Sequence, residues 1–145
     1  MPARDTYHGV VKNALVQDGW TITHDPYRLT IGVRRGYVDL GAEMPIAAEK
    51  GSRRIAVEVK SFLGASELED LENALGQYGV YRVALAKRDP DRTLYLAIPD
   101  VMRGLLLEER DFSDILGAFG IRLILFNPQQ ERIVQWIETI PTGPS

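Results

Sequence analysis

Cysteine is absent from the 145-residue chain, which excludes a disulfide framework, a thiolate metal site and a cysteine nucleophile. No apolar run is long enough to span a bilayer, and no apolar signal-peptide core follows the first residues. We therefore expect a cytoplasmic protein with no membrane contact. Hydrophobic residues make up 45% of the chain, enough for one compact domain at 1–140 followed by a flexible tail at 141–145.

An overall basic excess, common in proteins that bind nucleic acid, is also missing. The 17 Lys and Arg stand against 20 Asp and Glu, a formal net charge of -3. Basic residues nevertheless cluster in the first part of the chain, at Arg34, Arg35, Arg53 and Arg54. These arginines could form a phosphate-facing patch for nucleic acid, but charge alone favours two solvated turns.

Hydrophobic periodicity predicts a mixed α/β protein, in which helices cover a mixed sheet. We expect helices at 5–18, 66–79, 100–109 and 112–119. We expect strands at 20–23, 37–40, 46–49, 54–62, 80–86, 93–98, 121–126 and 132–137. Residues 24–36 are expected to be a polar connection, 41–45 a bend, and 50–53 the turn of a hairpin between strands 46–49 and 54–62.

The strand at 54–62 carries the pattern with the most chemical content. Side chains of a strand alternate between its faces, so Glu58 and Lys60 share one face. A salt bridge on a solvated face would explain this pair. With Asp39 upstream, however, Asp39 and Glu58 could bind Mg²⁺ or Mn²⁺ while Lys60 orients a water molecule. These three residues are our candidate catalytic centre for phosphodiester hydrolysis.

Two further carboxylates compete with this assignment. If the predicted hairpin closes tightly, Glu43 falls opposite Lys60 and Glu49 falls opposite Arg54. Glu43 could then bind the metal in place of Asp39 or beside it. Glu49 is better explained as a partner of Arg54 in a surface cross-strand pair.

Four polar residues on the first two predicted helices are secondary candidates. Asp5 could be a distant metal ligand or the N-cap of its helix, and His8 could contact phosphate or metal, although an exposed helix position explains it better. Tyr78 has the spacing of a core residue, whereas Gln77 is harder to assign to a core. No Ser-His-Asp triad, P-loop or glycine-rich dinucleotide motif is visible.

The order of these elements resembles the α-β-β-β-α-β core of PD-(D/E)xK nucleases. The acidic residue of the second strand precedes a Glu-x-Lys triplet on the next one, and a helix with a Ser66/Glu69 capping box follows directly. Gln77-Tyr78 resembles a Gln…Tyr element found on that helix in several of these families. The resemblance implies a restriction-endonuclease-like core with extra strands and a helix at its C-terminal end.

Almost the whole chain also resembles the XisH family, the fdxN element excision controlling factors of cyanobacteria. The matching segments are 3–8, 11–15, 18–26, 38–43, 46–50, 55–62, 70–78, 94–97 and 126–128. This resemblance implies a role in developmentally controlled excision of a DNA element, with DNA, an XisF-like recombinase and an XisI-like protein as partners, and self-association is possible. The first helix lacks an unambiguous glutamate, which favours one metal ion over two.

Overall fold

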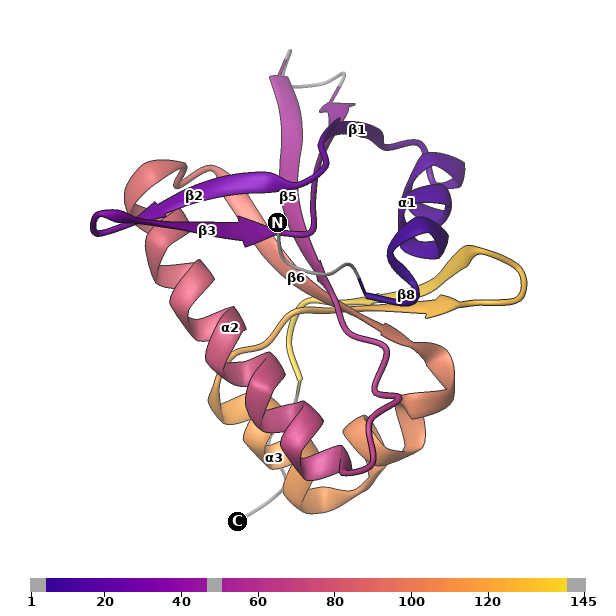
Figure 1. Ribbon diagram of the computed structural model, residues 1–145. Coiled ribbons are helices and arrows are strands. Elements are labelled where there is room, and N and C mark those ends of the chain that lie inside the picture. The colour runs from indigo at the N-terminus through magenta and orange to yellow at the C-terminus, as the bar shows by residue number, and fades with distance from the viewer. Residues whose placement is uncertain (1–4, 47–50, 141–145) are drawn as a thin grey trace.

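The computed structural model describes residues 5–46 and 51–140. Its helices are α1 (His8–Gln17), α2 (Glu67–Arg88) and α3 (Arg110–Ala118). Its strands are β1 (Thr21–His24), β2 (Tyr27–Ile31), β3 (Arg34–Val38), β4 (Leu40–Ile46), β5 (Gly51–Val59), β6 (Arg92–Pro99), β7 (Leu123–Asn127) and β8 (Arg132–Ile137). Six strands form one sheet in the order β1-β4-β5-β6-β7-β8, and β2 and β3 form a separate hairpin that projects from the body of the molecule (Figure 1).

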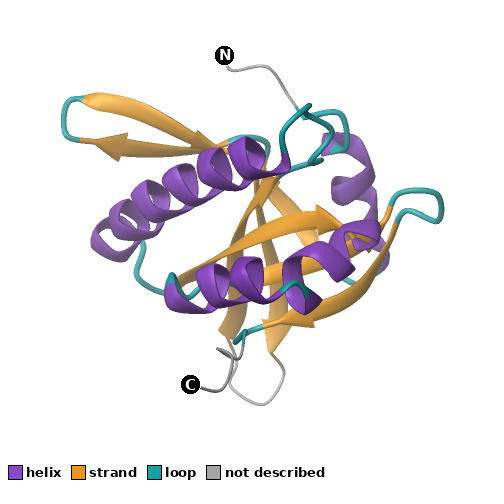
Figure 2. Ribbon diagram, turned by 90° about the horizontal axis from the view of Figure 1, so that it is seen from below, coloured by secondary structure: helices purple, strands orange, loops and turns teal. Residues whose placement is uncertain are grey.

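Helices cover both faces of this mixed sheet, as the sequence predicts. α2 and α3 lie on one face and α1 on the other (Figure 2), and each face has its own apolar cluster. β5, β6 and β7 are parallel to one another, while β1, β4 and β8 pair antiparallel with their neighbours. Without the β2–β3 hairpin, the elements from α1 to β6 follow the expected α-β-β-β-α-β order, so the predicted fold class is confirmed.

The central strand β5 is buried on both sides where it approaches the candidate centre. Ile55, Val57 and Val59 pack in the cluster under α1, whereas Ala56 packs in the cluster under α2. The predicted alternation is therefore confirmed. Glu58 is only 4% exposed, so the alternative of a salt bridge on a solvated strand face is wrong.

Helix α2 is much longer than the sequence pattern indicates. We predicted its end at Gly79 and a strand at 80–86, but the helix continues to Arg88. Ala84 and Leu85 extend its buried stripe against the sheet, while Val80 and Val83 are exposed. The free energy gained by burying these two side chains outweighs the roughly 1 kcal/mol that Gly79 costs inside the helix.

The expected polar connection at 24–36 contains the β2–β3 hairpin instead. Tyr27, Leu29 and Ile31 alternate with exposed polar residues, and Gly32 adopts a φ of +63° at the turn. A residue with a side chain is strained in that conformation, so glycine suits this tight connection.

The register of the β4–β5 hairpin also differs from the expectation. Glu43 lies opposite Arg54, and Ile46 lies opposite Gly51, so the predicted bend at 41–45 is wrong, and residues 51–53 belong to β5 rather than to a turn. Of the strand predicted at 46–49, only Ile46 lies among the described residues, and it belongs to β4. Pro45 fits inside β4 because the pairing of β1 ends at Glu43, which leaves no neighbouring strand to receive its missing N–H. Glu49 lies outside the described residues.

Three smaller expectations have mixed outcomes. The helix predicted at 100–109 is a 3₁₀ turn (Asp100–Met102) followed by a π-helical turn (Gly104–Glu108), whereas the short helix after it is confirmed as α3. None of the helices in the described part of the chain is both long and apolar enough to cross a bilayer. The predicted tail at 141–145 lies outside the described residues.

Candidate metal centre

Asp39, Glu58 and Lys60 meet at one end of β5. Asp39 lies in the bend between β3 and β4, Glu58 is the penultimate residue of β5, and Lys60 follows that strand directly. The Asp39 Oδ2 atom accepts a hydrogen bond from the Val59 N–H at 2.7 Å. In return, Glu58 Oε1 accepts one from the Asp39 N–H at 3.2 Å. These reciprocal bonds hold the two carboxyl groups beside one another.

The environment of Glu58 strongly disfavours its charged form. Burial raises the pKa of Glu58 to about 8, and both the negative charge of Asp39 and a hydrogen bond between the two side chains act in the same direction. The positive charge of Lys60 opposes this rise in pKa only in part. Without a cation, the pair therefore keeps one proton at neutral pH.

The oxygen atoms at this position suit a divalent ion. Mg²⁺ prefers carboxylate oxygens and usually takes one or two of them, completing its shell with water and substrate phosphate. A cation would replace the shared proton and relieve the repulsion between Asp39 and Glu58. Within the described residues no group of three or more acidic or histidine side chains could hold a metal ion.

Helix α2 contributes a wall to this centre. Burial raises the pKa of Tyr81, and the negative charges of Glu58 and Asp39 raise it further. Gln77 lies one turn earlier on the same stripe, and its buried Oε1 atom has no hydrogen-bond partner among the described residues. The sequence prediction missed Tyr81 because it placed that residue in a strand. The spacing of four residues between Gln77 and Tyr81 could have indicated that both lie on one side of a longer helix.

Tyr78 serves the core. Its side chain is fully buried, and its hydroxyl donates to the Leu94 carbonyl at 2.9 Å and accepts from the Arg122 N–H at 3.2 Å. These bonds fix α2 against β6 and β7, on the stripe beside the one that carries Gln77.

Asp5 connects the start of the chain to the segment after Lys60. One carboxylate oxygen accepts from the Tyr7 N–H and the other from the Ser61 N–H, each at 3.0 Å. The N-cap of α1 is Tyr7, with no side-chain cap, so Asp5 is not the N-cap residue. Asp5 and Lys60 line a pocket of about 170 Å³ together with Asn73 of α2.

His8 has a structural partner. It is buried rather than exposed, because its ring packs under α1 with Nε2 2.7 Å from Asp25 Oδ1. Lys12 donates to the other Asp25 oxygen at 2.8 Å. Burial tends to raise the pKa of Asp25, but the hydrogen bonds from Lys12 and His8 outweigh it and lower that pKa. This cluster joins α1 to the turn after β1.

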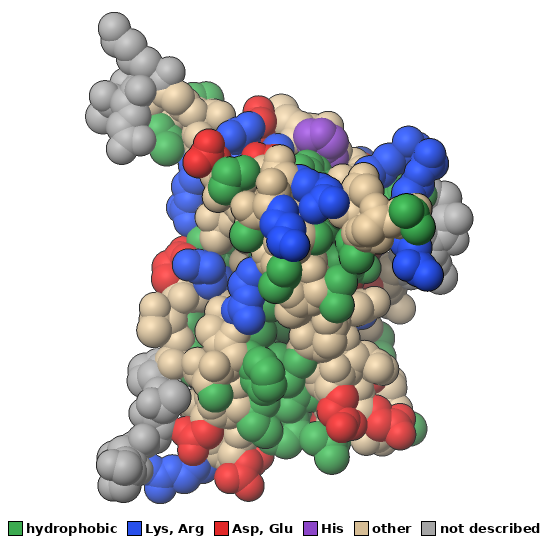
Figure 3. Space-filling model, turned by 90° about the vertical axis from the view of Figure 1, so that its left-hand side faces the viewer, with side chains coloured by type: hydrophobic (Ala, Val, Ile, Leu, Met, Phe, Trp, Pro, Cys, Tyr) green, Lys and Arg blue, Asp and Glu red, His purple; other side chains and the backbone are tan. Residues whose placement is uncertain are grey.

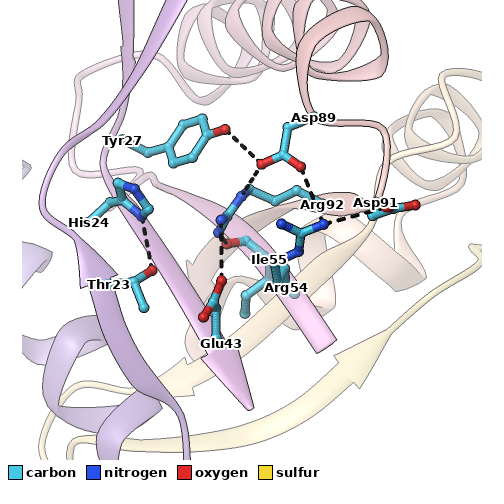
Figure 4. A network of polar contacts seen from close by, with 9 residues as sticks. All are labelled: Thr23, His24, Tyr27, Glu43, Arg54, Ile55, Asp89, Asp91 and Arg92. Carbon is cyan, nitrogen blue, oxygen red and sulfur yellow. Dashed lines mark hydrogen bonds and ion pairs between the residues drawn. The ribbon is translucent and has the colours of Figure 1, made fainter. Parts of the chain in front are cut away.

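Glu43 belongs to a different network, drawn in Figure 4. Its carboxylate lies 3.8 Å from the buried guanidinium of Arg92. Arg92 also donates to Asp89 at 2.9 Å and to the Ile55 carbonyl at 2.8 Å, and it stacks over the Tyr27 ring. These contacts join the hairpin, β4 and the end of α2, and they leave Asp39 as the partner of Glu58.

The four arginines singled out in the sequence do not form one patch. Arg34 and Arg35 lie on the β2–β3 hairpin. Arg53 lies over the Trp20 and Trp136 rings, 5.6 Å from each centroid, and pairs with Glu138. Arg54 pairs instead with Asp89 and Asp91 (Figure 4).

A family model and two solved structures are similar to this chain, and their descriptions agree with one another. The family model described as XisH protein matches residues 1–134. A crystal structure of an XisH family protein from Nostoc punctiforme PCC 73102 is 37% identical, with a TM-score of 0.81 over 92% of this chain and 99% of that one. An fdxN element excision controlling factor protein from Anabaena variabilis is 39% identical, with a TM-score of 0.83 over the same shares of the two chains. No curated protein matches.

Proposed function

The chain belongs to the XisH family, and from this premise we propose that it controls excision of a DNA element by acting on DNA at the Asp39–Glu58–Lys60 centre. Control of fdxN element excision is what the name of the Anabaena variabilis relative states for that protein. The proposed action on DNA is metal-dependent cleavage of a phosphodiester bond.

One observation carries this proposal: the buried carboxyl group of Glu58 lies against the half-buried Asp39, beside a lysine. Glu58 is held at 4% exposure against Asp39, with its pKa raised to about 8. A buried acid beside another acid is costly for a fold unless a cation or a catalytic task uses the pair. A hydrophobic residue at position 58 would suit the surrounding core of β5 better.

Each of the three residues has a distinct task in the proposed reaction. Asp39 and Glu58 would hold Mg²⁺ or Mn²⁺, which when bound polarises the phosphoryl oxygen and lowers the pKa of a water molecule. The Lys60 ammonium orients that water and stabilises the negative charge that develops on the phosphate. The reciprocal bonds between the Asp39 loop and β5 keep both carboxylates in place before DNA arrives.

A second candidate function is control by binding alone, with an XisF-like recombinase or an XisI-like protein as the partner. The acidic first half of α2, with Glu67, Glu69, Asp70 and Glu72, favours a protein partner over DNA on that side of the molecule. Co-purification with each candidate partner tests this function, and substitution of these acids should weaken the complex.

Relaxation of supercoiled plasmid by the purified protein tests the first proposal. With Mg²⁺ or Mn²⁺ we expect nicked or linear product, and none with a chelator. Lys60→Met should slow cleavage by about 100-fold or more, since removal of one group that stabilises developing charge costs this much. Glu58→Gln and Asp39→Asn should remove metal-dependent cleavage.

Glu43→Gln is the matched control, because it removes a carboxylate of the adjacent strand that pairs with Arg92 rather than with the centre. This variant should retain most of the activity. Undiminished cleavage by Lys60→Met and Glu58→Gln would show that the activity comes from elsewhere.

A further inference from the structure

The outer face of the β2–β3 hairpin is basic and exposed. The register pairs Arg28 with Tyr37 and Thr30 with Arg35, so these four side chains occupy one face of the two-stranded ribbon. Arg28, Thr30 and Arg35 are exposed on this face. Arg34 pairs with Ile31, which assigns it to the other face, and it is exposed beside the turn. Residues 27–38 contain three arginines and no acidic residue.

The inner face of the same hairpin anchors it to α2. Leu29 and Val38 are buried in the cluster under that helix, with Tyr81 packed against it. A Cβ atom on Gly36 would lie 3.3 Å from the Tyr81 ring, so the strand approaches the helix closely. The ribbon is therefore a positioned platform whose basic face points to solvent.

The last turn of α2 extends this basic surface. Lys87 and Arg88 are exposed there, beside the hairpin. Figure 3 views this side of the molecule and shows most of its Lys and Arg in the upper half, with some Asp and Glu among them at the upper left and further groups of Asp and Glu at the lower edge. We call the following five residues the basic wing: Arg28, Arg34, Arg35, Lys87 and Arg88.

The basic wing differs in its ion pairing from Arg53, Arg54 and Arg92, which have acidic partners. Within residues 5–46 and 51–140, no wing residue forms an ion pair. A cluster of unneutralised cations on a fixed ribbon suits a polyanion.

The wing also leads into the candidate centre. β3 ends at Val38, and Asp39 is the next residue. An anion that runs along the ribbon towards its base thus approaches the segment that carries Asp39. The repeated charges of a sugar–phosphate backbone match this arrangement, because successive phosphates can contact the arginines while one reaches the centre.

We propose that the basic wing binds the backbone of duplex DNA and delivers a phosphodiester to the Asp39–Glu58 pair. This inference rests on the proposed function, since it assigns the surface that presents the substrate to the same centre. The contacts are to phosphate, so binding is independent of base sequence and falls steeply with salt.

A salt-titrated binding assay with a short DNA duplex tests the wing. The variant Arg28→Gln/Arg34→Gln/Arg35→Gln should weaken binding about tenfold or more at low salt. It should also reduce the slope of log K against log salt by about 3, roughly one for each phosphate that the variant no longer neutralises. The control is Arg103→Gln/Arg110→Gln/Arg132→Gln, which removes the same charge from exposed sites outside the wing and should bind within about twofold of the unaltered protein.

Equal binding by the wing variant and the unaltered protein would overturn the inference, and so would equal weakening by both triple variants. Absence of duplex binding by the unaltered protein would overturn it as well. Titration of Mn²⁺ into the wing variant separates the two proposals, because removal of the wing charges should leave metal binding unchanged. If the wing variant binds duplex DNA as tightly as the unaltered protein but the unaltered protein cleaves plasmid, the inference about the wing fails and the proposed function holds. If the wing variant binds more weakly but the unaltered protein does not cleave, the proposed function fails and the inference about the wing holds.

Discussion

Glu58 is the residue of the candidate centre whose pKa changes most on folding. Its pKa rises from an ordinary value of 4.5 to about 8 in the folded protein. Between these two values the folded state keeps a proton that the unfolded state has released. Stability is therefore highest below about pH 4.5 as far as this group is concerned, and it is lost as pH rises through 8.

Glu58→Gln should remove this pH dependence. The amide keeps an oxygen that can accept from the Asp39 N–H but carries no charge. We expect the metal-free variant to be more stable than the unaltered protein near pH 9, by up to about 5 kcal/mol, because the pKa of Glu58 rises from 4.5 to about 8 and each pKa unit corresponds to about 1.4 kcal/mol. Urea denaturation at a series of pH values measures the free energy of unfolding of both proteins, and the exposed Glu72→Gln serves as control. Curves of this free energy against pH that run parallel for Glu58→Gln and the unaltered protein would contradict the account.

Metal affinity should follow the same titration. An ion at the Asp39–Glu58 pair has to displace the shared proton, so the apparent affinity should rise about tenfold per pH unit below 8 and level off above it. Calorimetric titration of Mn²⁺ in buffers with different ionisation heats should detect release of about one proton. Affinity that does not change with pH would show that the ion binds elsewhere.

The residues of the centre were accessible from the sequence, because a strand period of two and an upstream acid define them. Their burial was not. The Glu58-x-Lys60 pattern is the same in the sequence whether the end of the strand is exposed or buried. Only the packing of α2 over β5 shows that Glu58 is buried. The burial of His8 was equally hidden, since its partner Asp25 is 17 residues away.

At the scale of elements, α2 shows how local signals can mislead. Gly79 and the apolar run after it resemble a helix end followed by a strand, yet they form the second half of one helix. The deciding factor is the tertiary surface offered by β6 and the hairpin, which no local pattern contains. Tyr81 was missed through that error.

Two glycine substitutions test this packing in opposite directions. Gly76 lies inside α2, and a Cβ atom added there would have no neighbour within 4 Å, so Gly76→Ala should stabilise the protein by up to about 1 kcal/mol through helix propensity. At Gly36 a Cβ atom would lie 2.7 Å from Ile31 Cδ1 and 3.3 Å from Tyr81 Cε1. Gly36→Ala should therefore destabilise it by roughly 1–2 kcal/mol. Urea denaturation measures both changes, and stabilisation by Gly36→Ala would contradict the close approach of hairpin and helix.

The whole molecule combines a mixed sheet, covered by helices on both faces, with a projecting hairpin (Figure 1). The α-β-β-β-α-β order and the helices on both sheet faces followed from periodicity and family resemblance. The hairpin did not, because its short strands alternate over only five residues each and lie among turn-forming residues. The hairpin lies beside the last turn of α2, which holds Lys87 and Arg88, at the opposite end of this helix from its acidic first turn (Figure 1).

Ligand-dependent stability tests the centre in the intact protein. An ion that binds only the folded state at 100 times its dissociation constant adds about 2.7 kcal/mol, or roughly 8 °C in Tm for a chain of this size. We expect this shift with Mn²⁺ at pH 8, a smaller one at pH 6, and none in Asp39→Asn. A Tm that stays flat across the titration would contradict metal binding.

The most direct test of the centre is the anomalous scattering of a crystal soaked in Mn²⁺ at pH 8. The account predicts one peak within coordination distance, about 2–2.5 Å, of carboxylate oxygens from both Asp39 and Glu58. Lys60 should lie beside it without binding the ion. A crystal with no peak there, and with the two carboxyl groups still hydrogen-bonded to each other, would contradict the claim that this pair is a metal centre.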